Sequence, residues 1–238
     1  MKKIILILLF IAVVFSGLFL FYKTANPIKN KATIVILNGP SAAGKTSIQK
    51  EFQKLMYEPY LAIGLDNFFV GVLPQHYMGG TPTQLNMPKK DVAWGEFSKK
   101  DEFPIFTLHF GVEGQKVISG MHHAIAAYAK QGNNIIVDYI LYRPEWLKEL
   151  VNVLKDYNVI FVGIDIPLEL LEQREKQRAT SPVGHARSHF DTVYGPNIYD
   201  IKCDTSVLTA GQCAQQIRDF IKSGKKPEAF EKLRKLLK

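Results

Sequence analysis

The sequence predicts an α/β protein in which a mostly parallel sheet is covered by helices on both faces. Short apolar runs, typical of buried parallel strands, alternate along the chain with amphipathic segments that are typical of helices. A glycine-rich loop at residues 39–46 joins the first such run to the first such segment. In sheets of this kind the connections are right-handed and ligands bind beyond the carboxyl ends of the strands.

The expected elements follow one another from residue 33 to the end of the chain. Strands are expected at 33–38, 60–65, 134–139, 158–166 and near 198–203. Helices are expected at 44–56, 113–131, from Pro144 onward, at 168–178, near 210–222 and over 229–238. Pro144 suits the first turn of its helix, and Gly132 is a stop signal for the helix before it. The last segment is expected to close the fold, with a helix lying on a membrane surface as the alternative.

The stretch 71–112 does not follow this alternation of strands and helices. It is rich in proline and glycine, and irregular segments of this length inside a compact domain usually serve a function. Its position after the second strand predicts an insertion that covers or binds the substrate. A tolerated surface loop is the alternative.

The N-terminal segment is predicted to be separate from the rest of the fold. Residues 4–22 carry no charge, and as a helix they would be about 28 Å long, close to the roughly 30 Å of a bilayer's hydrocarbon core. We therefore expect a transmembrane anchor over 1–23, a linker over 24–32 and the catalytic domain over 33–238. A cleaved signal is the alternative. A cleaved signal would mean that the domain is exported, and only in that case would a disulfide between Cys203 and Cys213 be favoured over two packed thiols.

The charge distribution argues against nucleic acid as a partner. The chain carries a formal net charge of +8, but residues 1–32 and 222–238 each carry +5, which leaves 33–221 at about −2. A central segment with a net charge this close to zero lacks the basic face of a nucleic-acid-binding protein. The positive ends are better suited to an anionic membrane surface.

Residues 39–46, GPSAAGKT, form a complete GxxxxGK[ST] motif between a predicted strand and a predicted helix. Inward-facing amides of such a loop hold phosphate oxygens, and the positive end of the helix dipole adds to their effect. Lys45 suits the β- and γ-phosphates, and the Thr46 hydroxyl suits Mg²⁺. The motif predicts a P-loop that binds ATP and Mg²⁺. The expected nucleotide contacts are Gly39, Pro40, Ser41, Ala42, Ala43, Gly44, Lys45, Thr46 and Ser47.

Two aspartates are expected close to this loop. Asp66 is expected at the end of the second strand, where its carboxylate could take the proton of an attacking hydroxyl. A helix N-cap is the alternative for Asp66. Asp138 follows three apolar residues in the third strand, IIVD, and could hold Mg²⁺ or orient the acceptor. A structural aspartate is its alternative.

Arg174 and Arg178 are four residues apart, on one face of a predicted helix that precedes a breaker-rich stretch. Guanidinium groups near a transferring phosphoryl group stabilise its charge. The pair therefore predicts a lid over the phosphates, and solvated surface arginines are the alternative. His122 and His123 lie within a helix without further metal ligands nearby in sequence, and we interpret them as ordinary helix residues.

The motifs ILNGPSAAGKTSI, LAIGLDNFF, NNIIVDYIL, VIFVGIDIPLELLEQREKQR and IYDIKCDTS resemble those of the chloramphenicol phosphotransferase-like family of P-loop kinases. The resemblance runs from about Thr33 to Ile221. It implies a shikimate-kinase-like fold and phosphorylation of a substrate hydroxyl by ATP and Mg²⁺. It also implies that Lys45 and Thr46 contact nucleotide and metal, that Asp66 is the general base, and that Arg174 and Arg178 stabilise the phosphates.

Together these observations predict a kinase that transfers the γ-phosphate of ATP to a hydroxyl of a small molecule. The abundance of ATP in the cytosol favours a cytoplasmic domain on a single-pass anchor. Two other functions stay open: an anchored ATP-binding module without transfer activity, and a toxin-like kinase that acts on a larger acceptor.

Overall fold

The computed structural model describes residues 32–69, 71–72, 92–195 and 197–237. The predicted anchor over 1–23, and all of the predicted linker except Ala32, lie outside the described residues. Within the described ranges, no helix combines the length and the apolar character that crossing a membrane requires.

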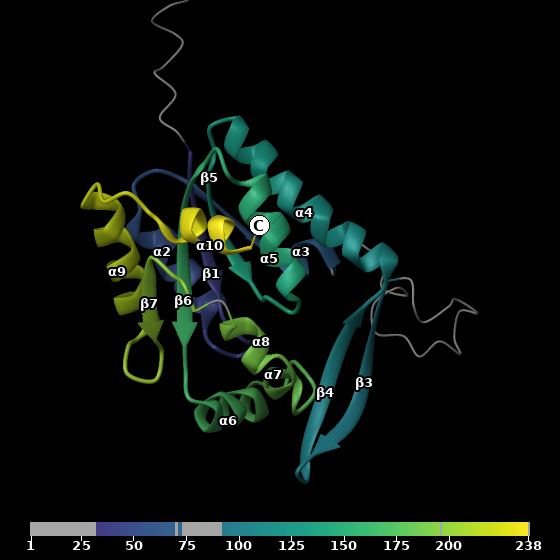
Figure 1. The fold of residues 1–238 in the computed structure, drawn as a ribbon. Helices are drawn as coiled ribbons and strands as arrows, with labels where there is room; N and C mark the ends of the chain where they lie inside the picture. Colours follow the sequence, from purple (N-terminus) through teal and green to yellow (C-terminus); the bar gives the residue numbers. More distant parts are fainter. Residues whose placement is uncertain (1–31, 70, 73–91, 196, 238) are drawn as a thin grey trace, which may run out of the picture. The chain divides into compact units, whose positions relative to one another are not determined.

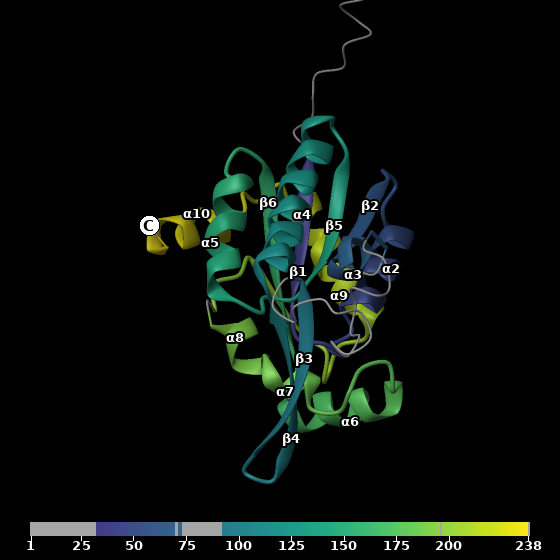
Figure 2. The same cartoon turned by 90° about the vertical axis from the view of Figure 1, so that its right-hand side faces the viewer.

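A five-stranded sheet forms the centre of the fold, in the order β2-β5-β1-β6-β7 (Figures 1 and 2). All four pairings between neighbouring strands are parallel, as the sequence predicts. The strands are β1 (Thr33–Asn38), β2 (Tyr60–Gly64), β5 (Asn134–Tyr139), β6 (Asn158–Asp165) and β7 (Ile201–Asp204). The segment before β7 joins the sheet through the Asp200 carboxylate, which accepts the Phe161 N–H at 2.9 Å, so regular pairing starts slightly later than expected.

The six predicted helices are present. They are α2 (Lys45–Leu55), α4 (Val112–Lys130), α5 (Pro144–Val153), α6 (Leu168–Arg178), α9 (Ala210–Lys222) and α10 (Ala229–Leu236). Three short helices were not expected: α3 (Leu65–Phe69), α7 (His185–Ser188) and α8 (Phe190–Tyr194). The closing helix α10 buries Phe230 and Leu233 in the core, which agrees with its expected role in the fold.

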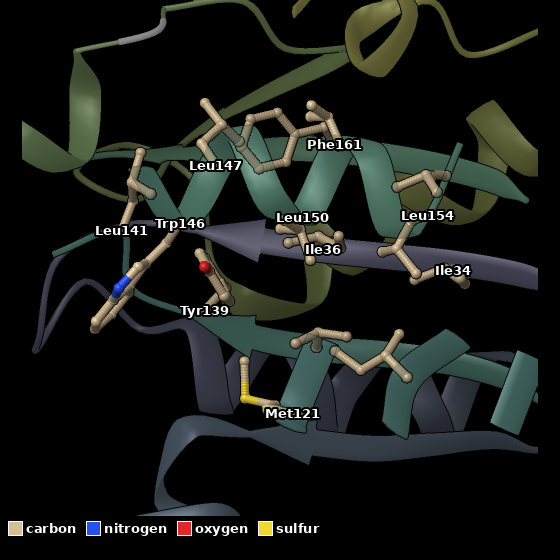
Figure 3. Packing of buried hydrophobic residues seen from close by; sticks show 14 of the residues in the cluster. Ile34, Ile36, Met121, Tyr139, Leu141, Trp146, Leu147, Leu150, Leu154 and Phe161 are labelled. Atoms are coloured by element: carbon tan, nitrogen blue, oxygen red, sulfur yellow. The ribbon is translucent and has the colours of Figure 1, made fainter. Parts of the chain in front are cut away.

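The sheet separates two apolar clusters because successive side chains of a strand point to opposite faces. On β1, Ile34 and Ile36 pack in the cluster under α4, α5 and α10, whereas Val35 and Leu37 pack in the cluster under α2 and α9. Figure 1 shows α2 and α9 on one side of the sheet and α4 and α5 on the other. Figure 3 shows how α5 and α4 side chains fill the first cluster over β1.

Both cysteines belong to the second cluster. Cys203 of β7 and Cys213 of α9 are buried free thiols. They occupy the packed positions that the sequence suggests for small apolar residues.

An antiparallel hairpin occupies part of the stretch 71–112, where no strand was expected, and in that respect the sequence interpretation was wrong. It consists of β3 (Ala93–Lys100) and β4 (Phe103–Phe110), with Ala93 opposite Phe110. Figures 1 and 2 show the hairpin beside α6 and α7, apart from the main sheet.

The docking of this hairpin explains why local sequence did not indicate it. The Phe106 N–H donates to the Gly184 carbonyl at 3.2 Å, between segments far apart in the chain. Gly184 has φ +90°, and a Cβ there would lie 2.2 Å from the Pro104 carbonyl oxygen. The hairpin therefore depends on a glycine about eighty residues downstream.

Candidate active site

The loop between β1 and α2 has the backbone of a phosphate-binding nest. Ala42 and Gly44 have positive φ angles of 64° and 96°, so that the chain turns its amides toward one side. Gly39 is required for a different reason: a Cβ there would lie 2.9 Å from Cβ of Ile164 on β6. The loop ends at the N-terminus of α2, which favours anions.

Lys45 is the most confined charge of this loop, with 4% of its side chain exposed. Its ammonium donates to the Pro40 carbonyl at 2.8 Å and lies 3.4 Å from Oδ1 of Asp138. Burial lowers the pKa of Lys45, and the Asp138 carboxylate partly offsets this effect. The side chain is thus held at the loop, where it can reach a bound phosphate.

The structure brings Thr46 and Asp138 together. The Thr46 hydroxyl donates to Oδ2 of Asp138 at 2.6 Å. The sheet register explains this proximity, because Asp138 of β5 lies between Leu37 of β1 and Gly64 of β2 at the carboxyl edge. A hydroxyl and a carboxylate are oxygen ligands of the kind that Mg²⁺ prefers, so these two residues fit the expected metal.

Asp66 lies in the first turn of α3 and not at the end of a strand, which corrects the sequence interpretation. The strand ends earlier because the Gly64 N–H donates to Oδ1 of Asn67 at 2.7 Å, and this contact starts the helix. The Asp66 side chain is nevertheless exposed to the same cavity as Lys45 and Asp138.

A cavity of about 1150 Å³ is lined by all the predicted site residues except Gly39 and Pro40. One part of its wall is the loop from Ser41 to Ser47, and another is Asp66 with Asp138. The helix α6 and the segment after β7 close a further side. The remaining lining residues named below are Tyr142, Arg174, Arg178, His185 and Thr205.

The two arginines of α6 are not equivalent. Arg174 donates to Oγ1 of Thr205 at 3.1 Å and to the Thr205 carbonyl at 2.6 Å, so it connects α6 to the loop after β7. Arg178 is exposed and lines the cavity, and its charge lowers the pKa of Lys45. Arg178 is therefore exposed to the cavity, whereas Arg174 is held by Thr205 in the cavity wall.

Several residues of the site were missed by sequence reasoning. Glu175 is buried on α6 and accepts the amide N–H groups of Gly184 at 2.8 Å and Ala186 at 2.7 Å. Tyr142 and His185 line the cavity, and their side chains lie 3.0 Å apart, from the Tyr142 hydroxyl to Nε2 of His185. One signal was available: Tyr142 follows Asp138 by four residues, in a loop at the sheet's carboxyl edge.

The protein combines a parallel sheet with this loop, a carboxylate beside the loop and arginines on a neighbouring helix. These features define the fold and site of a P-loop kinase, an enzyme that phosphorylates a hydroxyl. Residues 32–222 match the family described as "Chloramphenicol phosphotransferase-like protein". The chain therefore belongs to this family of phosphotransferases.

A curated relative agrees with this assignment, and solved structures share the fold. A protein of Mycobacterium tuberculosis with the provisional name O-phosphotransferase is 28% identical over 205 residues, which are 85% of this chain and 88% of the relative. The APS kinase of the same species, solved with AMPPNP and APS, aligns with a TM-score of 0.54 at 15% identity, over 81% of this chain and 98% of that one. A sugar kinase of a Janibacter species has a TM-score of 0.53 at 17% identity, with coverages of 81% and 95%. At such identities the two structures show the shared fold alone.

Proposed function

We propose that this protein is a kinase that uses ATP and Mg²⁺ to phosphorylate a hydroxyl of a small molecule. The observation that supports this most directly is the joint placement of Lys45, Thr46 and Asp138 at the P-loop, with Asp66 on the same cavity. These are the residue types that phosphoryl transfer needs: a charge for the phosphates, oxygen ligands for the metal and a base for the acceptor.

The nucleotide is expected to lie along the P-loop, with its β- and γ-phosphates at the amides of the loop and at the Lys45 ammonium. Thr46 and Asp138 would hold Mg²⁺, which when bound would neutralise negative charge on the phosphates. The other end of the nucleotide would lie toward α6 and Thr205, where Arg174 fixes the wall.

The acceptor is expected between Asp66 and the γ-phosphate. As its oxygen attacks phosphorus, the hydroxyl proton passes to the Asp66 carboxylate, the new O–P bond forms, and the bond from phosphorus to the bridging oxygen of ADP breaks. Arg178 faces the same space and would stabilise the charge on the phosphoryl oxygens. A cavity of about 1150 Å³ is larger than a typical site for one small ligand, which fits the simultaneous binding of nucleotide and acceptor.

The names of the relatives suggest where to look for the acceptor. The curated relative is called an O-phosphotransferase, and the family is named for chloramphenicol phosphotransferase. We therefore propose an alcohol as the acceptor group and chloramphenicol as the first compound to test, with sugars and nucleosides next.

The test is a screen of hydroxyl compounds with the full-length protein in detergent, γ-labelled ATP and Mg²⁺. We expect labelled product with at least one small alcohol, and its loss in Lys45→Ala. Binding of ATP in calorimetry without transfer to any acceptor would favour the anchored binding module. Label on protein or nucleic acid alone would favour a larger acceptor.

We also propose that residues 1–23 anchor the protein in a membrane with the kinase domain in the cytoplasm. The support is the uncharged run 4–22 and the cellular location of ATP. A C-terminal fusion to a reporter that is active on only one side of the membrane tests the orientation, and a shortened N-terminus in the mature protein would show cleavage and export.

A further inference from the structure

A buried histidine contacts the backbone of the P-loop. Nε2 of His189 accepts the amide N–H of Ser41 at 3.1 Å, across 148 positions of sequence. Only 3% of His189 is exposed. Ser41 is the third residue of the P-loop motif. The contact therefore holds the loop just before Ala42 and Gly44, its two residues with positive φ angles.

The hydrogen bonds around His189 require one neutral tautomer. The Ser188 hydroxyl donates to the His185 carbonyl at 2.7 Å, which leaves its oxygen free to accept from Nδ1 of His189 at 3.4 Å. Nδ1 then carries the proton, and Nε2 keeps the lone pair that receives the Ser41 N–H. Burial, followed by the neighbouring His185 and Lys45, lowers the pKa of His189 well below its ordinary value, so the ring stays neutral near pH 7.

Aromatic packing fixes the ring of His189 in place. The rings of His189 and Tyr142 meet edge to face, with their centroids 4.7 Å apart. The ring of His185 lies 4.9 Å away on another side and is itself held by the Tyr142 hydroxyl. The imidazole therefore has little rotational freedom, and its acceptor nitrogen is preorganised for the loop.

The segment that carries His189 is also tied to the arginine helix α6. The buried Glu175 of α6 accepts the N–H groups of Gly184 and Ala186, at the start of α7. Glu172 of α6 forms an ion pair with Arg187 of α7. Two glutamates of α6 thus hold α7, and His189, which directly follows α7, holds the P-loop.

We propose that His189 is a positioning residue of the nucleotide site: its neutral imidazole holds the Ser41 amide and thereby sets the conformation of the P-loop relative to α6. This inference rests on the proposed function, because it assumes that the P-loop binds ATP. It assigns His189 a role through the loop and not through contact with the reacting atoms.

The test compares two substitutions at this position. His189→Gln keeps a side-chain oxygen that can accept the Ser41 N–H, whereas His189→Leu has similar bulk and no acceptor. The leucine variant leaves the buried Ser41 N–H without an acceptor, which destabilises the loop conformation that binds the nucleotide. We expect the Kd for ATP·Mg²⁺ to rise roughly tenfold or more in His189→Leu, and to lie within about threefold of the wild type in His189→Gln.

A second buried histidine provides the matched control. His122 of α4 is fully buried and hydrogen-bonded to Glu149 and Tyr139, and it does not line the cavity. His122→Leu should lower the melting temperature and leave the Kd for ATP·Mg²⁺ of the folded protein unchanged. Equal ATP affinity in His189→Leu and wild type, or no rescue by His189→Gln, would overturn the inference.

A measurement on the wild-type protein does not depend on any variant folding. ¹⁵N NMR of the histidine rings should show His189 at pH 7 as a neutral imidazole with its proton on Nδ1. A proton on Nε2 would contradict the contact with Ser41. Failure of the proposed function would appear in the wild type as a lack of ATP binding, whereas failure of this inference alone would leave wild-type binding intact.

Discussion

The Thr46 hydroxyl and the Asp138 carboxylate are joined by a 2.6 Å hydrogen bond, although 92 positions of sequence separate them. The bond crosses from the first turn of α2 to the end of β5, and the same carboxylate lies 3.4 Å from the Lys45 ammonium. Asp138 therefore holds both Lys45 and Thr46, the two P-loop residues that we propose as the contacts of phosphate and metal.

Substitution Asp138→Asn should weaken Mg²⁺ binding. The amide keeps the size of the side chain but removes the charge that faces Lys45 and the metal. We expect the Mg²⁺ concentration for half-maximal transfer to rise at least roughly tenfold. The measurement is the initial rate over a Mg²⁺ titration at saturating ATP, and an unchanged midpoint would show that Asp138 has no role in metal binding.

Substitution Asp66→Asn should remove the base and spare the nucleotide site. General base catalysis contributes about 10²–10⁴-fold, so kcat should fall by at least about 10²-fold. The Kd for ATP, measured by calorimetry, should stay near the wild-type value because Asp66 is not part of the P-loop. A fully active Asp66→Asn enzyme would reject the assignment.

The arginines of α6 should give different kinetic signatures. Arg178→Ala removes a guanidinium that faces the phosphates, and we expect kcat to fall by about 10²-fold. Arg174→Ala breaks the two hydrogen bonds to Thr205, and its main expected effect is a higher KM for ATP. Steady-state kinetics of both variants decides between these roles, and identical losses of kcat would contradict the distinction.

Gly184→Ala should destabilise the fold because the hairpin packs against this glycine. The new Cβ would lie 2.2 Å from the Pro104 carbonyl oxygen, in addition to the strain of a φ of +90°. Gly132→Ala is the matched control, since Gly132 has φ +87° and open space around it. We expect a loss of about 1 kcal/mol in the free energy of unfolding for the control and at least about 2 kcal/mol for Gly184→Ala, measured in urea.

The free energy of unfolding should decrease as the pH falls below about 6.5. Burial, followed by the charge of Lys45, lowers the pKa of His185 to about 4, and burial also lowers the pKa values of His122 and His189. Between pH 6.5 and 4 the unfolded chain binds more protons than the folded one, so stability rises with pH in this window.

His185 alone should contribute a loss of about 2 kcal/mol between pH 7.5 and 5, by the linkage of its pKa shift to stability. Urea denaturation at these two pH values measures the change. His185→Gln, which does not titrate, should show a smaller difference between the two conditions. An equal difference in wild type and variant would mean that His185 is not buried as a neutral ring.

Local sequence was sufficient for the parallel sheet and for the location of the P-loop. The runs 33–38 and 134–139 match β1 and β5 residue for residue, because buried parallel strands are marked by continuous apolar residues. The identity of Lys45 and Thr46 follows from the motif, since a phosphate nest needs glycines and its charges at fixed spacing.

Local sequence also identified Asp66, Asp138, Arg174 and Arg178 as residues of interest, and the structure brings all four to one cavity. It could not separate the two arginines, because Arg174 is defined by a contact with Thr205, 31 positions away. Local sequence placed Asp66 at the end of a strand, whereas the residue lies in α3. This helix starts with a hydrogen bond from the Gly64 N–H to the Asn67 side chain, and such a contact leaves no periodic pattern in the sequence.

The sequence by itself determined the P-loop motif and the candidate residues for phosphoryl transfer, because these depend on residue type and short-range spacing. Only the tertiary structure decided where the hairpin docks, how α6 is tied to α7, and which histidine supports the P-loop. Those features consist of hydrogen bonds between segments that lie far apart in the chain, such as the one from Ser41 to His189. Contacts of this kind leave no periodic pattern in either segment, so they become visible only when the chain has folded.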